Sequence, residues 1–74
     1  MAKEVNEVAD DLRALLNGAG SGFLRLSWEK FYTLSEIERL HPTRWTQIVE
    51  ASLERGVVLG WGNNAVVLAD DFDS

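Results

Sequence analysis

The chain has 74 residues, of which 46% are hydrophobic and 26% are charged, and its formal net charge at pH 7 is −5. This length predicts a single domain with one core, and the composition is too apolar for an intrinsically disordered chain. Because the sequence has no cysteine and only one histidine, it excludes a disulfide scaffold, a thiolate or multi-histidine metal site and a thiol nucleophile.

Residues 3–17 have the spacing of an amphipathic helix, with apolar side chains at i, i+3, i+4 and i+7. The predicted buried stripe consists of Val5, Val8, Ala9, Leu12, Leu15 and Leu16. Acidic residues fill the opposite face, and those in the first turn suit the positive end of the helix dipole. A run rich in Asn and Gly over residues 17–22 ends this helix.

Residues 23–28 alternate in part between apolar and polar side chains, which predicts a short strand. Residues 30–32 either extend this strand or begin a helical turn. Thr33 and Glu36 match a capping box, in which the Thr33 hydroxyl accepts from the Glu36 amide. We therefore expect a short helix over residues 34–40. Its inner side chains would be Leu34, Ile37 and Leu40, and His41-Pro42 would end it.

Pro42 suits the first position of a further helix over residues 42–55, which Gly56 would end. Two β-branched runs around a Gly- and Asn-rich tip then predict a β-hairpin over residues 57–69. Residues 70–74 would be an acidic tail. Together these elements predict one α+β domain over residues 1–74, with three helices packed on a small antiparallel sheet.

This order of elements resembles the winged-helix variant of the helix-turn-helix family, and the resemblance covers residues 3–69. Leu34 and Ile37 match the family's Leu-x-x-Ile helix. Residues 53–58, Leu-Glu-Arg-Gly-Val-Val, match the end of its second helix and the first strand of its wing. The resemblance implies a winged-helix fold in which the C-terminal hairpin is the wing.

The resemblance also implies that residues 42–55 form a recognition helix for duplex DNA. Its outward groups would be Thr43, Arg44, Thr46 and Gln47. Arginine can bond guanine and glutamine can bond adenine, although Arg44 and Gln47 would equally suit a solvated helix face. Arg39, Arg25 and Lys30 are either phosphate contacts or ordinary surface charges. This hypothesis predicts a small transcription regulator, and a homodimer because one module offers few contacts.

A protein partner is the alternative, because the wing tip has no Lys or Arg and the chain is acidic overall. Trp61 would lie at that tip beside Asn63 and Asn64. Exposed aromatic residues at hairpin tips often anchor protein partners. The alternative is a structural role, in which the hairpin folds Trp61 back onto residues 3–17. On this hypothesis the chain is an interaction module or an inhibitor subunit. Trp28 and Trp45 are expected in the core.

The sequence predicts no enzyme, no catalytic residue, no metal and no cofactor. His41 precedes a proline in a turn and suits a structural role. The adjacent acids at 10–11 and 70–71 lack the spacing of a calcium loop. The longest apolar stretches are far shorter than the roughly 18 residues that span a bilayer, and the amino terminus has no signal-peptide core. We therefore expect a cytoplasmic protein without a membrane partner.

Overall fold

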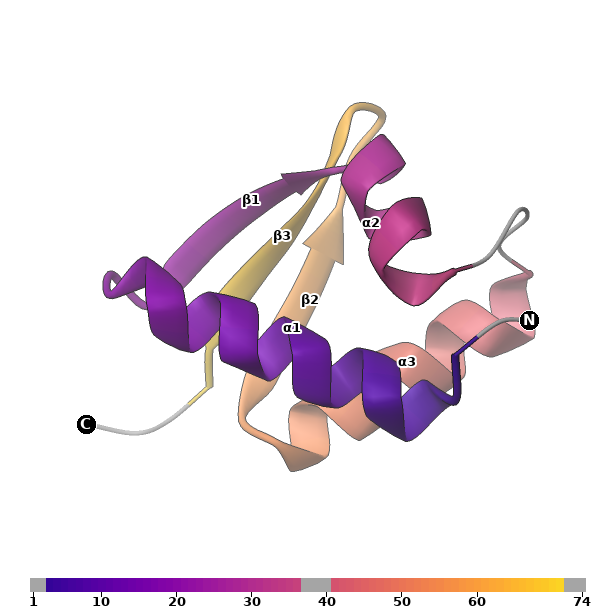
Figure 1. Ribbon diagram of the computed structural model, residues 1–74, viewed down its shortest axis with the longest axis horizontal. Coiled ribbons are helices and arrows are strands. Elements are labelled where there is room, and N and C mark those ends of the chain that lie inside the picture. Colours follow the sequence, from indigo (N-terminus) through magenta and orange to yellow (C-terminus); the bar gives the residue numbers. More distant parts are fainter. Residues whose placement is uncertain (1–2, 37–40, 72–74) are drawn as a thin grey trace.

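A computed structural model describes residues 3–36 and 41–71 of the chain. In chain order its elements are α1 (Val5–Ala19), β1 (Phe23–Ser27), α2 (Trp28–Ser35), α3 (Pro42–Glu54), β2 (Val57–Trp61) and β3 (Ala65–Asp70). The described residues thus form three helices and one antiparallel sheet of three strands. The predicted α+β class is confirmed, and the arrangement of the elements is consistent with a winged-helix-like layout (Figure 1).

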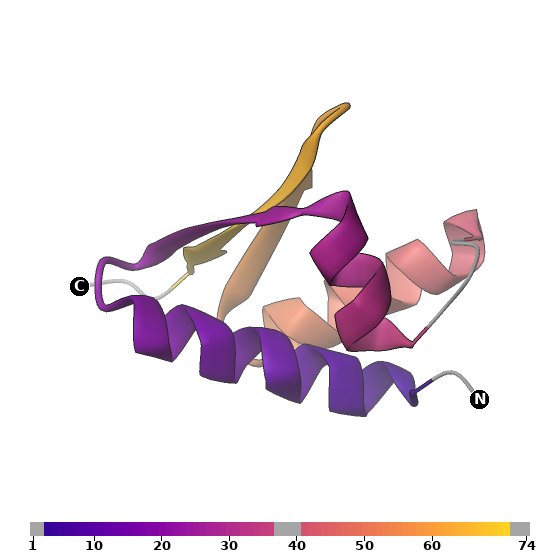
Figure 2. The ribbon, with the colours of Figure 1, turned by 45° about the horizontal axis from the view of Figure 1, so that its top comes forward.

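The sheet has the strand order β1-β3-β2, so the last strand lies in the middle. β1 pairs with β3 from Phe23 opposite Ala69 to Ser27 opposite Ala65. β2 and β3 form the predicted hairpin, in which Trp61 lies opposite Val66. This hairpin is called the wing below. All three helices lie on one side of the sheet, and the closed end of the wing extends away from α1 (Figure 2).

The core fills the space between the helices and the inner face of the sheet. Its fully or nearly buried members are Val8, Leu12, Leu16, Leu26, Phe31, Ile48, Val57, Leu59, Val66 and Leu68. The predicted stripe of the first helix therefore supplies much of this core, although Leu15 at its margin is exposed. On the strands, alternation sends Val57 and Leu59 inward and leaves Val58 exposed on the outer face.

The helix predicted over residues 34–40 is wrong in its position, because α2 occupies Trp28–Ser35. Ser27 is the N-cap, and its hydroxyl accepts a hydrogen bond from the Lys30 amide at 3.2 Å. Thr33 does not begin a helix but donates its hydroxyl to the Glu29 carbonyl at 3.0 Å, one turn back. Glu36 ends α2 in the left-handed region at φ 56°. Ile37 and Leu40 lie outside the described residues.

The α2 helix begins early because its start buries an aromatic side chain. Phe31 is fully buried at the second turn, and Trp28 packs against the core from the first. If the helix began at Thr33, Trp28 and Phe31 would have to be buried from a segment without regular structure. The strand predicted over residues 23–28 accordingly ends one residue sooner, at Ser27. Of the two alternatives for residues 30–32, the structure adopts the helical turn.

The other predicted elements are found with small shifts at their ends. The first helix runs over Val5–Ala19 and ends at Gly20 in the left-handed region at φ 74°. The helix predicted over 42–55 runs over Pro42–Glu54, with Pro42 in its first turn. Asp70, predicted to begin an acidic tail, is the last residue of β3. Residues 72–74 of that tail lie outside the described residues.

Candidate macromolecule interface

The solvent-facing stripe of α3 is mostly polar, and its charged residues are acidic. Its exposed side chains are Pro42, Thr43, Thr46, Gln47, Glu50, Leu53 and Glu54. Thr43, Thr46 and Gln47 are therefore exposed, as predicted for a recognition helix. The charges in this stripe are those of Glu50 and Glu54, and both are negative.

Arg44 is half-buried and is not a free outward group, contrary to the expectation from sequence. Its Nη2 donates to the backbone carbonyl of Lys3, in the segment that leads into α1. It lies one turn before the buried Ile48, on the flank of α3 that faces α1. The guanidinium is thus committed to holding the amino-terminal segment against α3.

Lys3 connects all three helices. Its backbone amide donates to the Ser35 carbonyl at the end of α2, at 3.3 Å. Its Nζ donates to Asp11 of α1 at 2.6 Å and lies 3.8 Å from Glu36. The hydrogen bond to Asp11 raises the pKa of Lys3 above its usual 10.5. Together with the Arg44 bond, these contacts fix the amino-terminal segment across the helix ends.

Trp61 is the most exposed large apolar side chain among the described residues, with 64% of its surface accessible. It shares the inner face of β2 with Val57 and Leu59, because side chains alternate along a strand. It nevertheless lies beyond the core, where its ring packs edge-on against Trp45 of α3 with centroids 5.3 Å apart. Trp61 therefore rests on α3 and does not fold back onto residues 3–17.

Trp28, Trp45 and Trp61 form a continuous row, which we call the tryptophan surface. The Trp28 and Trp45 ring centroids are 5.8 Å apart, and Phe31 packs behind both, 5.8 and 5.6 Å from them. Trp28 also donates its indole Nε1 to the Gly62 carbonyl in the wing at 2.7 Å. Trp28 and Trp45 were expected in the core, but both are half-buried and line this surface.

Two grooves flank the Trp61 ring, and Trp45 lines both of them. The first, the Pro42 groove, has a volume of about 250 Å³ and is lined by Trp28, His41, Pro42, Trp45 and Trp61. The second, the Glu50 groove, has a volume of about 290 Å³ and is lined by Trp45, Thr46, Val49, Glu50 and Trp61. Trp45 and Trp61 thus border two shallow, largely apolar depressions.

The remaining wing-tip residues are polar and open to solvent. Asn63 and Asn64 are both exposed, as predicted for partner-binding residues at the tip. The Gly62 amide donates to the Ala65 carbonyl at 2.9 Å and closes the loop that carries them. His41 is exposed at the start of α3, where its side chain makes no capping hydrogen bond.

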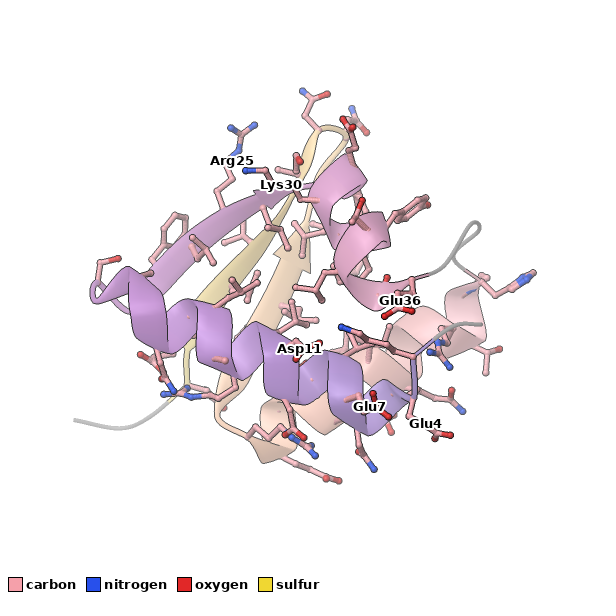
Figure 3. The ribbon with its side chains drawn as sticks, in the orientation of Figure 1. Glu4, Glu7, Asp11, Arg25, Lys30 and Glu36 are labelled. Atoms are coloured by element: carbon pink, nitrogen blue, oxygen red, sulfur yellow. The ribbon has the colours of Figure 1, made fainter. Side chains whose placement is uncertain are left out.

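Two exposed cations lie near the tryptophan surface but point away from it. Arg25 and Lys30 are exposed, form no ion pair within the described ranges, and lie at the end where β1 meets α2 (Figure 3). Arg25 belongs to the outer face of β1, because its neighbours Leu24 and Leu26 turn toward the core. Lys30 is two residues from Trp28 on α2 and so points away from it. Arg39 lies outside the described residues.

Other cations are held in ion pairs along α1. Arg13 bonds Asp70 at 2.6 Å, and Arg55 bonds Asp10 at 2.6 Å. Three acids lie along the first half of α1, namely its N-cap Glu4 and the helical residues Glu7 and Asp11 (Figure 3). Within the part of the chain that the structure describes, no cluster of acidic or histidine side chains could hold a metal ion. None of its helices has the length and apolarity to traverse a bilayer.

Comparison with family models, curated proteins and solved structures finds no match for this chain. The interface between α3 and the wing is the candidate functional site. Sequence reasoning identified Trp61 there from its place at a hairpin tip. It missed the joint surface with Trp28 and Trp45, because the one signal in the sequence, three tryptophans in separate elements, does not show that they meet.

Proposed function

We propose that this chain is a winged-helix module that binds a protein partner across the tryptophan surface. The observation that carries the proposal is the exposed Trp61 ring, held on Trp45 between two apolar grooves. Protein interfaces are enriched in such aromatic anchors, whose large surface is desolvated on binding. Covering about 100 Å² of apolar surface contributes on the order of 2.5 kcal/mol.

The contacts around Trp61 favour a preorganised binding surface. The Trp28 indole bonds the wing at Gly62, and Trp61 is paired in the sheet opposite Val66. The Trp28 bond joins the wing to α2, and the contact between Trp61 and Trp45 joins it to α3. Binding would therefore need to order little of this surface. Lower ordering cost means that more of the contact energy contributes to affinity.

The charges of the same face favour a protein over duplex DNA. Phosphate contacts require clustered Lys and Arg, but the exposed stripe of α3 carries Glu50 and Glu54. Arg44, the cation expected to read bases, bonds the Lys3 carbonyl instead. The tryptophan surface is lined by no Lys or Arg within the described ranges.

DNA binding through α3, as a dimeric transcription regulator, is the second candidate. The winged-helix-like order of elements and the exposed Thr43, Thr46 and Gln47 favour it. In this case Arg25 and Lys30 would supply phosphate contacts. Both candidates are non-enzymatic, and both include the cytoplasmic location expected from the sequence.

Selection from a displayed library of random peptides tests the proposal. We expect peptides that bind the native chain and bind Trp61→Ala at least about tenfold more weakly. Phe23→Ala is the matched control, because Phe23 is an aromatic residue with 54% exposure on the opposite face of the sheet. Circular dichroism and thermal unfolding would verify that both variants fold.

The proposal is wrong if the selected peptides bind Trp61→Ala as well as they bind the native chain. It is also wrong if random-sequence duplex DNA binds at low salt and Gln47→Ala weakens that binding while Trp61→Ala does not. The second result would establish α3 as a DNA-reading helix. Fluorescence anisotropy with labelled peptide and labelled duplex measures both affinities under one set of conditions.

A further inference from the structure

The two grooves beside Trp61 differ in chemistry, and the difference bears on what the partner carries. The Glu50 groove combines two indole rings, those of Trp45 and Trp61, with a carboxylate. Glu50 is exposed and makes no hydrogen bond or ion pair with any described residue. An unpaired carboxylate beside two aromatic rings suits a cation, which the ring faces and the negative charge both attract.

We propose that the partner is an extended, basic protein segment that places one Arg or Lys side chain in the Glu50 groove. There the cation lies against the Trp45 and Trp61 rings and pairs with the Glu50 carboxylate. This inference rests on the proposed function and specifies the chemistry of its partner. Arginine fits best, because its planar guanidinium both stacks on an indole and bonds a carboxylate through two nitrogens.

Charge complementarity across the whole face supports a basic segment. The described lining of the two grooves carries one carboxylate, that of Glu50, and one imidazole, that of His41, and no Lys or Arg. Glu54 lies one turn further along α3, and the chain as a whole has a net charge of −5. Arg25 lies on the outer face of the sheet and Lys30 on the side of α2 away from Trp28, and neither lines the two grooves.

The shape of the surface supports an extended conformation of the segment. A segment that occupies both grooves beside Trp61 would place one side chain in each. Side chains on the same face of an extended chain are two residues apart, or about 7 Å. The Pro42 groove, lined mainly by Trp28, Pro42, Trp45 and Trp61, would then take an apolar side chain, with proline favoured by stacking on the indoles.

A positional peptide library tests this inference. Random hexapeptides are synthesised with the third position fixed as Arg, Lys, citrulline, Leu or Glu, and binding is measured by anisotropy. Citrulline keeps the shape of arginine but removes its charge. We expect the Arg pool to bind about tenfold more tightly than the citrulline pool, and the Glu pool to bind most weakly.

Substitutions on α3 then assign the preference to one carboxylate. Glu50→Gln should reduce the Arg-to-citrulline ratio to near one, and Glu50→Arg should shift the preference to the Glu pool. Glu54→Gln is the matched control, because Glu54 is an exposed glutamate on the same helix that does not line the Glu50 groove. This control should leave the ratio unchanged.

The failure of this inference is distinguishable from the failure of the proposed function. Peptide binding that needs Trp61 but shows no Arg preference, or a preference that survives Glu50→Gln, overturns the basic segment alone. Absence of Trp61-dependent peptide binding overturns both proposals. Tight binding of single-stranded oligothymidine, or a concentration-dependent dimer that Trp61→Ala abolishes, would assign the surface to a different occupant and overturn this one.

Discussion

Ser35 and Ser52 are both fully buried in helices, but only one of their hydroxyls has a described partner. Ser35 Oγ donates to the Phe31 carbonyl at 2.8 Å, whereas Ser52 Oγ finds no partner among the described residues. Burying a polar group without a hydrogen bond costs free energy, and alanine also has the higher helix propensity.

The same substitution is therefore expected to have opposite effects at the two serines. Ser52→Ala should raise the free energy of unfolding by about 1 kcal/mol, and Ser35→Ala should lower it by a similar amount. Urea unfolding followed by circular dichroism measures both. If Ser52→Ala proves as destabilising as Ser35→Ala, the Ser52 hydroxyl has a bonding partner that this account lacks.

Arg44 allows a structural role to be separated from a role in reading DNA. Because its guanidinium bonds the Lys3 carbonyl, Arg44→Ala should lower the free energy of unfolding by about 1–3 kcal/mol. Gln47→Ala, at an exposed position of the same helix, should change it by less than about 0.5 kcal/mol. Equal stability of the two variants would contradict the structural role.

Lys3 predicts a loss of stability at alkaline pH. Its pKa is raised above 10.5 in the folded chain, mainly by the hydrogen bond to Asp11. The stabilisation is therefore present in full below about pH 10.5 and is lost as pH rises through the folded-state pKa.

Thermal unfolding as a function of pH measures this loss. The melting temperature of Lys3→Met should already be lower at neutral pH and should fall less steeply above pH 10.5 than that of the native chain. Lys30→Met is the control, because Lys30 is exposed and forms no ion pair within the described ranges. A parallel alkaline decline in the native chain and Lys3→Met would disprove the role of this lysine.

At the scale of elements, removing the hydroxyl of Ser27 or of Thr33 tests where α2 begins. Ser27→Ala removes the N-cap and should cost about 1 kcal/mol of stability. Thr33→Ala, within the helix, should be neutral or slightly stabilising, because alanine is the better helix former. Chemical unfolding compares the two. A larger loss for Thr33→Ala would restore the helix start predicted from the sequence.

The regular elements with strong patterns could be predicted from sequence, and α2 could not. The α1 stripe, Pro42 at the start of α3 and the Gly/Asn tip of the wing each rest on local geometry that few alternatives satisfy. The capping box at Thr33 predicted one start for this helix, and the structure begins it at another, with Ser27 as the N-cap. Choosing between them depends on the burial of Phe31 against distant elements, which no local pattern contains.

The candidate site was predicted in part for the same reason. Trp61, Thr46 and Gln47 were expected to be exposed from a hairpin tip and a helix periodicity, and they are. Arg44 was expected to be exposed too, but its position beside the carbonyl of Lys3 depends on how α1 packs against α3. The contact between Trp45 and Trp61 likewise depends on where the sheet places the wing.

At the scale of the whole molecule, the fold separates its surfaces by chemistry. The amino-terminal half of α1 carries acids, and the β1–α2 end carries Arg25 and Lys30 (Figure 3). The tryptophan surface joins α2, α3 and the wing through Trp28, Trp45 and Trp61. A winged-helix-like frame thus presents an aromatic, acidic face where the resemblance implied a DNA recognition helix. This distribution is what leads us to a basic protein segment as partner.

Two-dimensional NMR of the indole Nε1–H groups tests this central claim most directly, because each of the 3 tryptophans gives one signal. On titration with an Arg-containing peptide from the library, we predict large shifts at Trp61 and Trp45. A smaller shift is predicted at Trp28, whose Nε1 stays bonded to Gly62. Random duplex DNA at low salt should shift none of them. The account is contradicted if DNA shifts the backbone amides of Thr46 and Gln47 while the peptide leaves all three indoles unmoved.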